Sequence, residues 1–123
     1  ADDYLADLGI TAADRAVLEF LSAGEPLTVP EIAARYHVSR QHVQVTVNRL
    51  AKKALVITRK NPRHKRSALI AISASGKRLF ARVTRRESAI VAEIFAGIPR
   101  QDIKVTRRTL QSLTMKFETG DSP

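Results

Sequence analysis

Residues 28–50 read TVPEIAARYHVSRQHVQVTVNRL, and this stretch decides the fold of the chain. Its first part, Thr28 to Glu31, is a capping box with a proline in the first helical turn, where the missing N–H costs nothing. The box predicts a short helix that ends near Tyr36. His37 follows, and histidine tolerates the left-handed backbone of a tight turn better than most residues do.

A second helix is predicted directly after this turn. Ser39 is a favourable N-cap, and Val43, Val47 and Leu50 follow at spacings that place them on one face of a helix. Two short helices joined by a tight turn, the second one capped and amphipathic, are the pattern of a helix-turn-helix.

The upstream sequence predicts two further helices. Asp3 to Leu8 has apolar residues at helical spacing but is too short to be stable alone. Thr11 to Asp14 is a second capping box, followed by an apolar stripe and then by Gly24, which we expect to end that helix.

The downstream sequence predicts a β-hairpin and two long helices. Residues 55–59 and 69–72 are strand-like, and the basic segment 61–66 between them forms the hairpin tip. Ser73 or Ser75 then caps a helix of about twenty residues, and a last helix begins at Pro99. The fold class is therefore mainly α with a small β-hairpin wing, a winged helix-turn-helix with additional helices at both ends.

Composition excludes several classes of protein. The chain has 123 residues, no cysteine and no stretch apolar enough to span a membrane. Thiolate metal sites, disulfides and thiol redox switches are thereby excluded, and we expect a soluble, cytoplasmic protein. The net charge of +9 favours a polyanionic partner, with nucleic acid first and a membrane surface second.

The positive charge is concentrated in the middle of the chain. Residues 32–86 contain fifteen basic residues, all three histidines and no acid, whereas the two flanks together carry a charge of −6. Solvated surfaces normally mix both signs, so a segment without carboxylates indicates a surface that meets phosphate.

The second helix of the helix-turn-helix carries the candidate base-reading residues. On a helical wheel, its outer face lies opposite the apolar stripe. The residues of that face, or at its edge, are Gln41, Gln44, Val45, Asn48 and Lys52. The amides can bond adenine in a bidentate manner and a valine can meet a thymine methyl, so we expect A·T-rich contacts. The alternative is that these amides are ordinary solvated residues.

Other residues of the basic segment are candidates for contacts that do not read bases. We expect phosphate contacts from Ser39, Arg40, His42, Arg49 and Lys53. At the hairpin tip, the candidates for minor-groove and backbone contacts are Arg63, Lys65 and Arg66.

Apolar stripes near the two ends of the chain predict a dimer. They consist of Tyr4, Leu5, Leu8, Ile90, Ile94, Leu110, Leu113 and Phe117. These residues could belong to the core of one subunit, but two long helices cannot bury a full stripe against so small a domain. A twofold dimer would match a palindromic operator.

The order of these segments resembles the MarR family of bacterial transcription regulators. The resemblance rests on residues 27–33, on residues 49–56, similar to the family pattern RLxxKGLV, and on residues 61–76, similar to DxxDxRxxxLxLTxxG. It implies a DNA-binding lobe at about residues 10–73 and dimerisation helices at about residues 1–9 and 74–118. Two departures are Ala54 in place of the usual glycine and His64 in place of the Asp that orients the wing arginine.

The resemblance implies a sequence-specific regulator that binds double-stranded DNA as a homodimer. It also implies a repressor that a small aromatic or anionic effector releases from its operator. Two alternatives stay open: a winged-helix module that docks an acidic protein, and a nonspecific DNA-binding protein without an effector. No phosphate-binding loop or catalytic motif occurs, so we expect no enzyme, metal site or cofactor.

Overall fold

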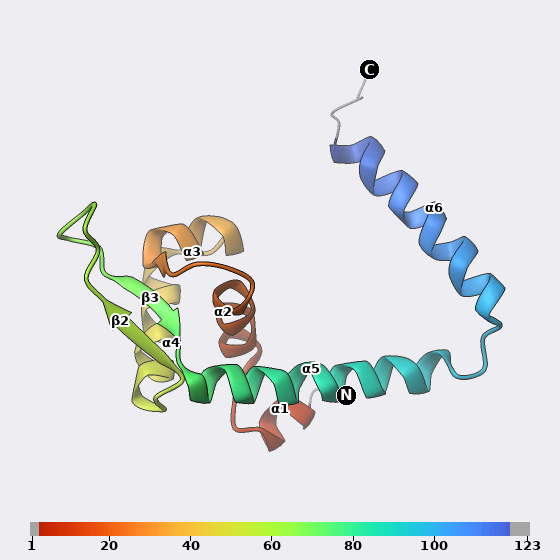
Figure 1. Cartoon of the computed structure of the whole chain (residues 1–123), viewed down its shortest axis with the longest axis horizontal. Coiled ribbons are helices and arrows are strands. Elements are labelled where there is room, and N and C mark those ends of the chain that lie inside the picture. The colour runs from red at the N-terminus through yellow and green to blue at the C-terminus, as the bar shows by residue number, and fades with distance from the viewer. Residues whose placement is uncertain (1–2, 119–123) are drawn as a thin grey trace. The chain divides into compact units, whose positions relative to one another are not determined.

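The computed structural model describes residues 3–118, which divide into two compact units, one ending at Glu87 and the other beginning at Ser88. The elements of the first unit are α1 (Asp3–Asp7), α2 (Ala12–Ser22), β1 (Leu27–Thr28), α3 (Val29–Tyr36), α4 (Arg40–Lys52), β2 (Val56–Arg59) and β3 (Leu69–Ile72) (Figure 1). The division falls within α5 (Ala74–Phe95), and α6 (Arg100–Glu118) belongs to the second unit. None of the helices between residues 3 and 118 is both long and apolar enough to span a bilayer.

The strands form a three-stranded antiparallel sheet in the order β1-β3-β2. The predicted hairpin is confirmed, with Val56 of β2 opposite Ile72 of β3. The third strand, β1, was not predicted from the sequence; its Leu27 lies opposite Ile70. Two residues are too few for an alternating pattern, and Thr28 was recognised only as an N-cap. The short β1 covers the edge of β3 that the hairpin alone would leave unpaired.

The helix-turn-helix is confirmed, together with its caps. The Thr28 hydroxyl accepts the Glu31 N–H at 3.3 Å, and the Glu31 carboxylate accepts the Thr28 N–H at 2.9 Å. His37 adopts the left-handed conformation, with φ of 59°. Ser39 then begins α4 by accepting the His42 N–H at 3.0 Å. Two directional caps and one left-handed residue thus set the angle at which α4 leaves α3.

The hydrophobic core of the first unit lies between the helices and the sheet. Leu18 of α2, Ile32 of α3, Val43 and Leu50 of α4, and Val83 of α5 are completely buried. Each such side chain contributes roughly 1.5–3 kcal/mol relative to an exposed one. This core fixes which side of α4 faces inward and therefore which side remains available to a partner.

The start of α5 packs against the turn that follows α4. Ser73, one of the two predicted caps, accepts the Gly76 N–H at 3.0 Å and donates to the Ala54 carbonyl at 2.6 Å. A Cβ on Gly76 would lie 2.1 Å from the Leu55 carbonyl oxygen. Glycine is therefore required at position 76 for the close approach of α5 to this turn.

The turn after α4 contains an alanine in a backbone conformation that favours glycine. Ala54 has φ of 60°, which costs an L-residue roughly 1–2 kcal/mol. We expect Ala54→Gly to raise the free energy of unfolding by about 1 kcal/mol, because the relief of strain exceeds the added entropy of the unfolded chain. Urea denaturation measures the change.

Ala51→Gly is the matched control, since Ala51 is an exposed residue with helical geometry in α4. There the same substitution should lower the free energy of unfolding by about 1 kcal/mol. A loss of stability at both positions would show that the left-handed conformation of Ala54 carries no strain.

Candidate nucleic-acid interface

The outer face of α4 is exposed as the helical wheel predicts. Val43, Val47 and Leu50 are buried, as is Thr46 beside them. The exposed residues on and beside the opposite face are Gln41, Gln44, Val45, Asn48 and Lys52. Val45 is 55% exposed. An exposed valine between amides is suited to contact base edges in a DNA groove, which present both methyl groups and hydrogen-bonding groups.

Two amides of this face are already bonded to each other. The Gln44 Nε2 group donates to the Asn48 Oδ1 atom at 2.8 Å, one helical turn further along. This bond restrains both side chains, and the Asn48 amino group and the Gln44 side-chain oxygen have no other hydrogen-bond partner among the described residues. One donor and one acceptor are the groups that a bidentate contact to adenine requires.

The start of α4 offers groups suited to phosphate. Ser39 and Arg40 are exposed, and the structure records no partner for the Arg40 guanidinium within residues 3–118. His42 is also exposed, but its ring lies 6.3 Å from the ring of Tyr36, which in turn contacts Phe20. His42 is therefore held toward α3, whereas Arg40 is unpaired at the exposed end of the helix.

The wing tip, residues 61–66, is organised by Asn61. Its side-chain oxygen accepts the Arg63 N–H at 3.0 Å, and its carbonyl accepts the His64 N–H at 3.3 Å. Arg63, His64 and Lys65 are exposed. Arg66 is exposed too, and over the described residues its guanidinium has neither a hydrogen bond nor an ion pair. An asparagine turn thus shapes the tip, and the tip itself contains no carboxylate, although Glu31 of α3 lines a hollow together with Arg63.

The structure brings α4 and the wing together around one hollow of about 500 Å³. Its walls include Arg40, Gln41, Gln44 and Asn48 of α4, together with Arg66. Residues that the sequence analysis assigned separately to the helix and to the wing therefore face a common space. No carboxylate occurs on α4, on the hairpin or between them, so the hollow has a positive potential.

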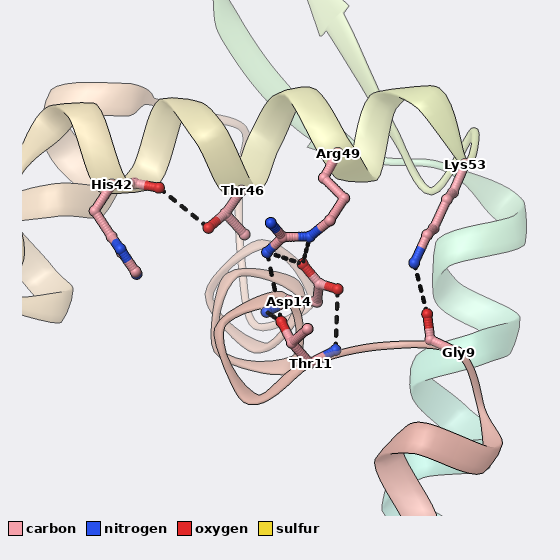
Figure 2. A network of polar contacts seen from close by, with 7 residues as sticks. All are labelled: Gly9, Thr11, Asp14, His42, Thr46, Arg49 and Lys53. Carbon is pink, nitrogen blue, oxygen red and sulfur yellow. Dashed lines mark hydrogen bonds and ion pairs between the residues drawn. The ribbon is translucent and has the colours of Figure 1, made fainter.

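Two residues predicted to contact phosphate point elsewhere. The Arg49 guanidinium donates from Nη2 to Asp14 Oδ1 at 2.7 Å and from Nε to the same atom at 2.9 Å (Figure 2). The Lys53 ammonium donates to the Gly9 carbonyl at 2.6 Å. Both side chains reach the start of α2 and the loop before it. Their assignment to phosphate stays a prediction, and in this structure they join α4 to α2.

Asp14 is the residue of this region that the sequence analysis missed. It was recognised only as the last residue of a capping box, and that box is present, with the Asp14 N–H donating to the Thr11 hydroxyl at 3.1 Å. Its carboxylate is completely buried, and it accepts the Thr11 N–H at 3.0 Å besides the two bonds from Arg49. The sequence offered no signal for the second role, because Arg49 is 35 residues away.

The residues predicted to form a dimer interface fall into two groups. Tyr4, Leu5 and Leu8 are half-buried against the core of the first unit. The second unit has a mostly exposed apolar surface, with Ile94 at 66% and Phe117 at 84% exposure. It also has an apolar groove of about 1030 Å³ between the end of α5 and α6. The use of both groups in a dimer stays a prediction.

A carboxylate of α5 connects three elements of the first unit. Glu87 accepts two bonds from the Arg15 guanidinium, at 2.5 and 2.7 Å, and one from the Tyr4 hydroxyl. The Arg15 bonds lower the pKa of Glu87, and the Glu87 bond raises the pKa of Tyr4. α1, α2 and α5 are thus held together by one anion.

Metal chemistry finds no support in the described residues. Nowhere in residues 3–118 do three or more histidine, aspartate or glutamate side chains gather in a way that could hold a metal ion.

A family model and several solved structures relate this chain to one family. A model described as MarR family matches residues 8–67, which run from the end of α1 into the wing. The uncharacterized protein Rv2011c of Mycobacterium tuberculosis is 31% identical over 92 residues, covering 75% of this chain and 64% of that protein. The chain thus spans less than two thirds of the length of this relative.

Two solved structures from Rhodococcus are similar over most of the chain. A MarR family transcriptional regulator from Rhodococcus sp. RHA1 has a TM-score of 0.74 and 26% identity, covering 91% of this chain and 79% of that one. CouR from Rhodococcus jostii RHA1, bound to p-coumaroyl-CoA, has a TM-score of 0.70 with the same identity and coverage. The similarity extends beyond the helix-turn-helix in both structures.

The Glu87 cluster gives a pH-dependent prediction. Because its pKa is lowered in the folded state, the ionised carboxylate stabilises the fold above the normal glutamate pKa of about 4.3, and this contribution is lost as the pH falls through the folded value. We expect Glu87→Gln to lower the free energy of unfolding by about 1 kcal/mol at pH 7 and by much less near pH 3. Urea denaturation at several pH values measures it.

Glu93→Gln is the control, because Glu93 is an exposed carboxylate on the same helix. It should change the stability little at any pH. An effect of Glu87→Gln that is equal at pH 7 and pH 3 would contradict a role for the ionised form.

Proposed function

Since this chain belongs to the MarR family of transcription regulators, we propose that it is a sequence-specific regulator that binds double-stranded DNA as a homodimer. The observation that carries the proposal is the hollow shared by α4 and the wing. There the exposed amides of Gln41, Gln44 and Asn48 lie beside the unpaired arginines Arg40 and Arg66.

The mode of binding follows from these groups. We assign base reading in the major groove to the outer face of α4, since a helix fits that groove and amides pair with adenine. Arg40 and Lys52 supply phosphate contacts, and the wing-tip arginines Arg63 and Arg66 reach the adjacent minor groove. Because no acidic residue of the hairpin orients Arg66, its contact depends on electrostatic attraction and on groove shape.

The dimer is supported by the exposed apolar surface of the second unit. Leu110, Leu113 and Phe117 are exposed on one side of α6, and contiguous exposed apolar residues mark sites of protein–protein contact. A second copy of the chain covers this surface, and the resulting twofold symmetry corresponds to a palindromic operator with half-sites about one helical turn apart.

Regulation by a small molecule is the last part of the proposal. We propose that the protein is a repressor and that it binds a small aromatic or anionic effector. The effector stabilises a conformation in which the two DNA-binding lobes of the dimer no longer fit the operator. The p-coumaroyl-CoA bound by the CouR structure indicates one kind of compound to examine first. An effector is the expected signal because the chain has no cysteine to oxidise.

The first prediction concerns base reading. In the combined variant Gln41→Ala, Val45→Ala and Asn48→Ala, we expect affinity for the preferred sequence to fall about a hundredfold or more. Binding to random DNA and its salt dependence should stay unchanged, because the phosphate contacts remain. Selection from a random DNA library followed by salt titrations measures both.

Gln101→Ala is the matched control, since Gln101 is an exposed glutamine that belongs to α6 and not to the outer face of α4. If the triple variant keeps the preference of the wild type, the outer face of α4 does not read bases, and a module that docks an acidic protein is favoured. If no palindrome is enriched even by the wild type, the protein binds DNA nonspecifically.

The second prediction concerns the dimer. Leu110→Glu places a charge on the apolar surface of α6, and we expect the dimer dissociation constant to rise at least about a hundredfold. Analytical ultracentrifugation measures it. Ser112→Glu, on the opposite side of α6, should leave the dimer intact. Equal behaviour of both variants would exclude this surface as the interface.

A further inference from the structure

We propose that Arg49 and Asp14 are a positioning pair for α4, and that Arg49 sets the orientation of the outer face and does not contact phosphate. This inference rests on the function proposed above, because it explains how the base-reading residues are held in place. It replaces the role that the sequence predicts for Arg49.

The geometry shows that the Arg49 charge is already satisfied. Two N–H groups of the guanidinium bond Asp14 Oδ1 at 2.7 and 2.9 Å, and Nη2 also approaches the Thr11 hydroxyl at 3.4 Å. Asp14 Oδ2 accepts the Thr11 N–H at 3.0 Å. Both oxygens of Asp14 therefore have a partner, and two of the three guanidinium nitrogens of Arg49, Nε and Nη2, are bonded (Figure 2).

Burial makes this pairing hard to release. The Asp14 side chain is 0% exposed, whereas that of Arg49 is 36% exposed. A buried carboxylate has lost its hydration. If it also loses its cation, nothing offsets the free energy of desolvation, which is strongly unfavourable. If Arg49 turned toward a phosphate, the Asp14 carboxylate would lose its cation and the fold would become less stable. Its charge is also largely neutralised, so it would release little counterion from DNA.

A second bond lies one turn further along α4. Lys53 donates to the Gly9 carbonyl at 2.6 Å, so two polar groups about 6 Å apart along the helix attach the same side of α4 to the region around the start of α2. Apolar contacts, such as those of Val47 and Leu50, are not directional, but hydrogen bonds are. The polar bonds therefore restrict rotation of α4 about its axis.

Small rotations matter at the outer face. A rotation of α4 by about 20° would move atoms near the helix surface by roughly 2 Å, given a helix radius of about 6 Å with side chains. That displacement exceeds what a hydrogen bond to a base edge tolerates. Phosphate contacts from flexible lysine and arginine side chains are less sensitive, so a loosened α4 should lose sequence preference before general affinity.

Asp14→Asn separates the two roles of Arg49 by the sign of its effect. If Arg49 positions α4, the weakened pair lets the helix shift, and affinity for the preferred sequence should fall about tenfold while affinity for random DNA and the salt slope stay unchanged. If Arg49 contacts phosphate, removing the competing carboxylate frees the cation, and binding to both kinds of DNA should become tighter. Salt titrations on both kinds of DNA measure these effects.

Arg49→Lys provides a second test that keeps the charge. Lysine serves well as a phosphate contact but cannot form the two converging bonds that the guanidinium makes with Asp14 Oδ1. We expect a loss of about fivefold or more at the preferred sequence. Arg40→Ala is the comparator for a true phosphate contact, and it should weaken binding to all DNA and reduce the salt slope by about 1.

The outcomes are distinct. Tighter binding by Asp14→Asn, or wild-type affinity of Arg49→Lys, overturns the positioning role. Circular dichroism establishes that each variant is folded, and Arg49→Lys decides the question if Asp14→Asn does not fold. A wild-type protein without any sequence preference overturns the proposed function itself, which is a different result from either variant outcome.

Discussion

Folding removes the carboxylate of Asp14 completely from water, and the arrangement of the helix-turn-helix depends on how that charge is compensated. One oxygen completes the cap of α2, and the other receives the guanidinium of Arg49 from α4. A single buried anion thus caps the start of one helix and fixes another. The hydrophobic core decides which side of α4 is inside, and this polar contact restricts its rotation about the axis.

Charge has different roles in different parts of the molecule. The cations near α2 and α5, Arg49 and Arg15, are paired with the buried or half-buried carboxylates Asp14 and Glu87. Those around the hollow between α4 and the wing have no such partners. The basic segment of residues 32–86 therefore contains a cation that holds the fold together, Arg49, as well as cations that remain available to an anionic partner.

Patterns among residues close together in the sequence predicted most of the fold. They did not predict the contacts between residues that are far apart in the sequence. Both capping boxes, the left-handed His37, the apolar stripe of α4 and the hairpin follow from residues within a few positions of one another. β1 was not predicted because two residues are too few to form an alternating pattern. The partner of Arg49 was not predicted because nothing in the sequence distinguishes this arginine from the others of the basic segment. The outer face of α4 was predictable, since helical periodicity alone separates it from the buried face.

Asp14 and Arg15 are consecutive residues, yet their side chains bind different helices, α4 and α5. Both contacts depend on the number of residues since the N-cap Thr11, because each added residue turns a helix by about 100°. An insertion or deletion of one residue in this first turn would misdirect both side chains at once. Unlike a surface loop, this short segment can vary at its exposed positions but not in length.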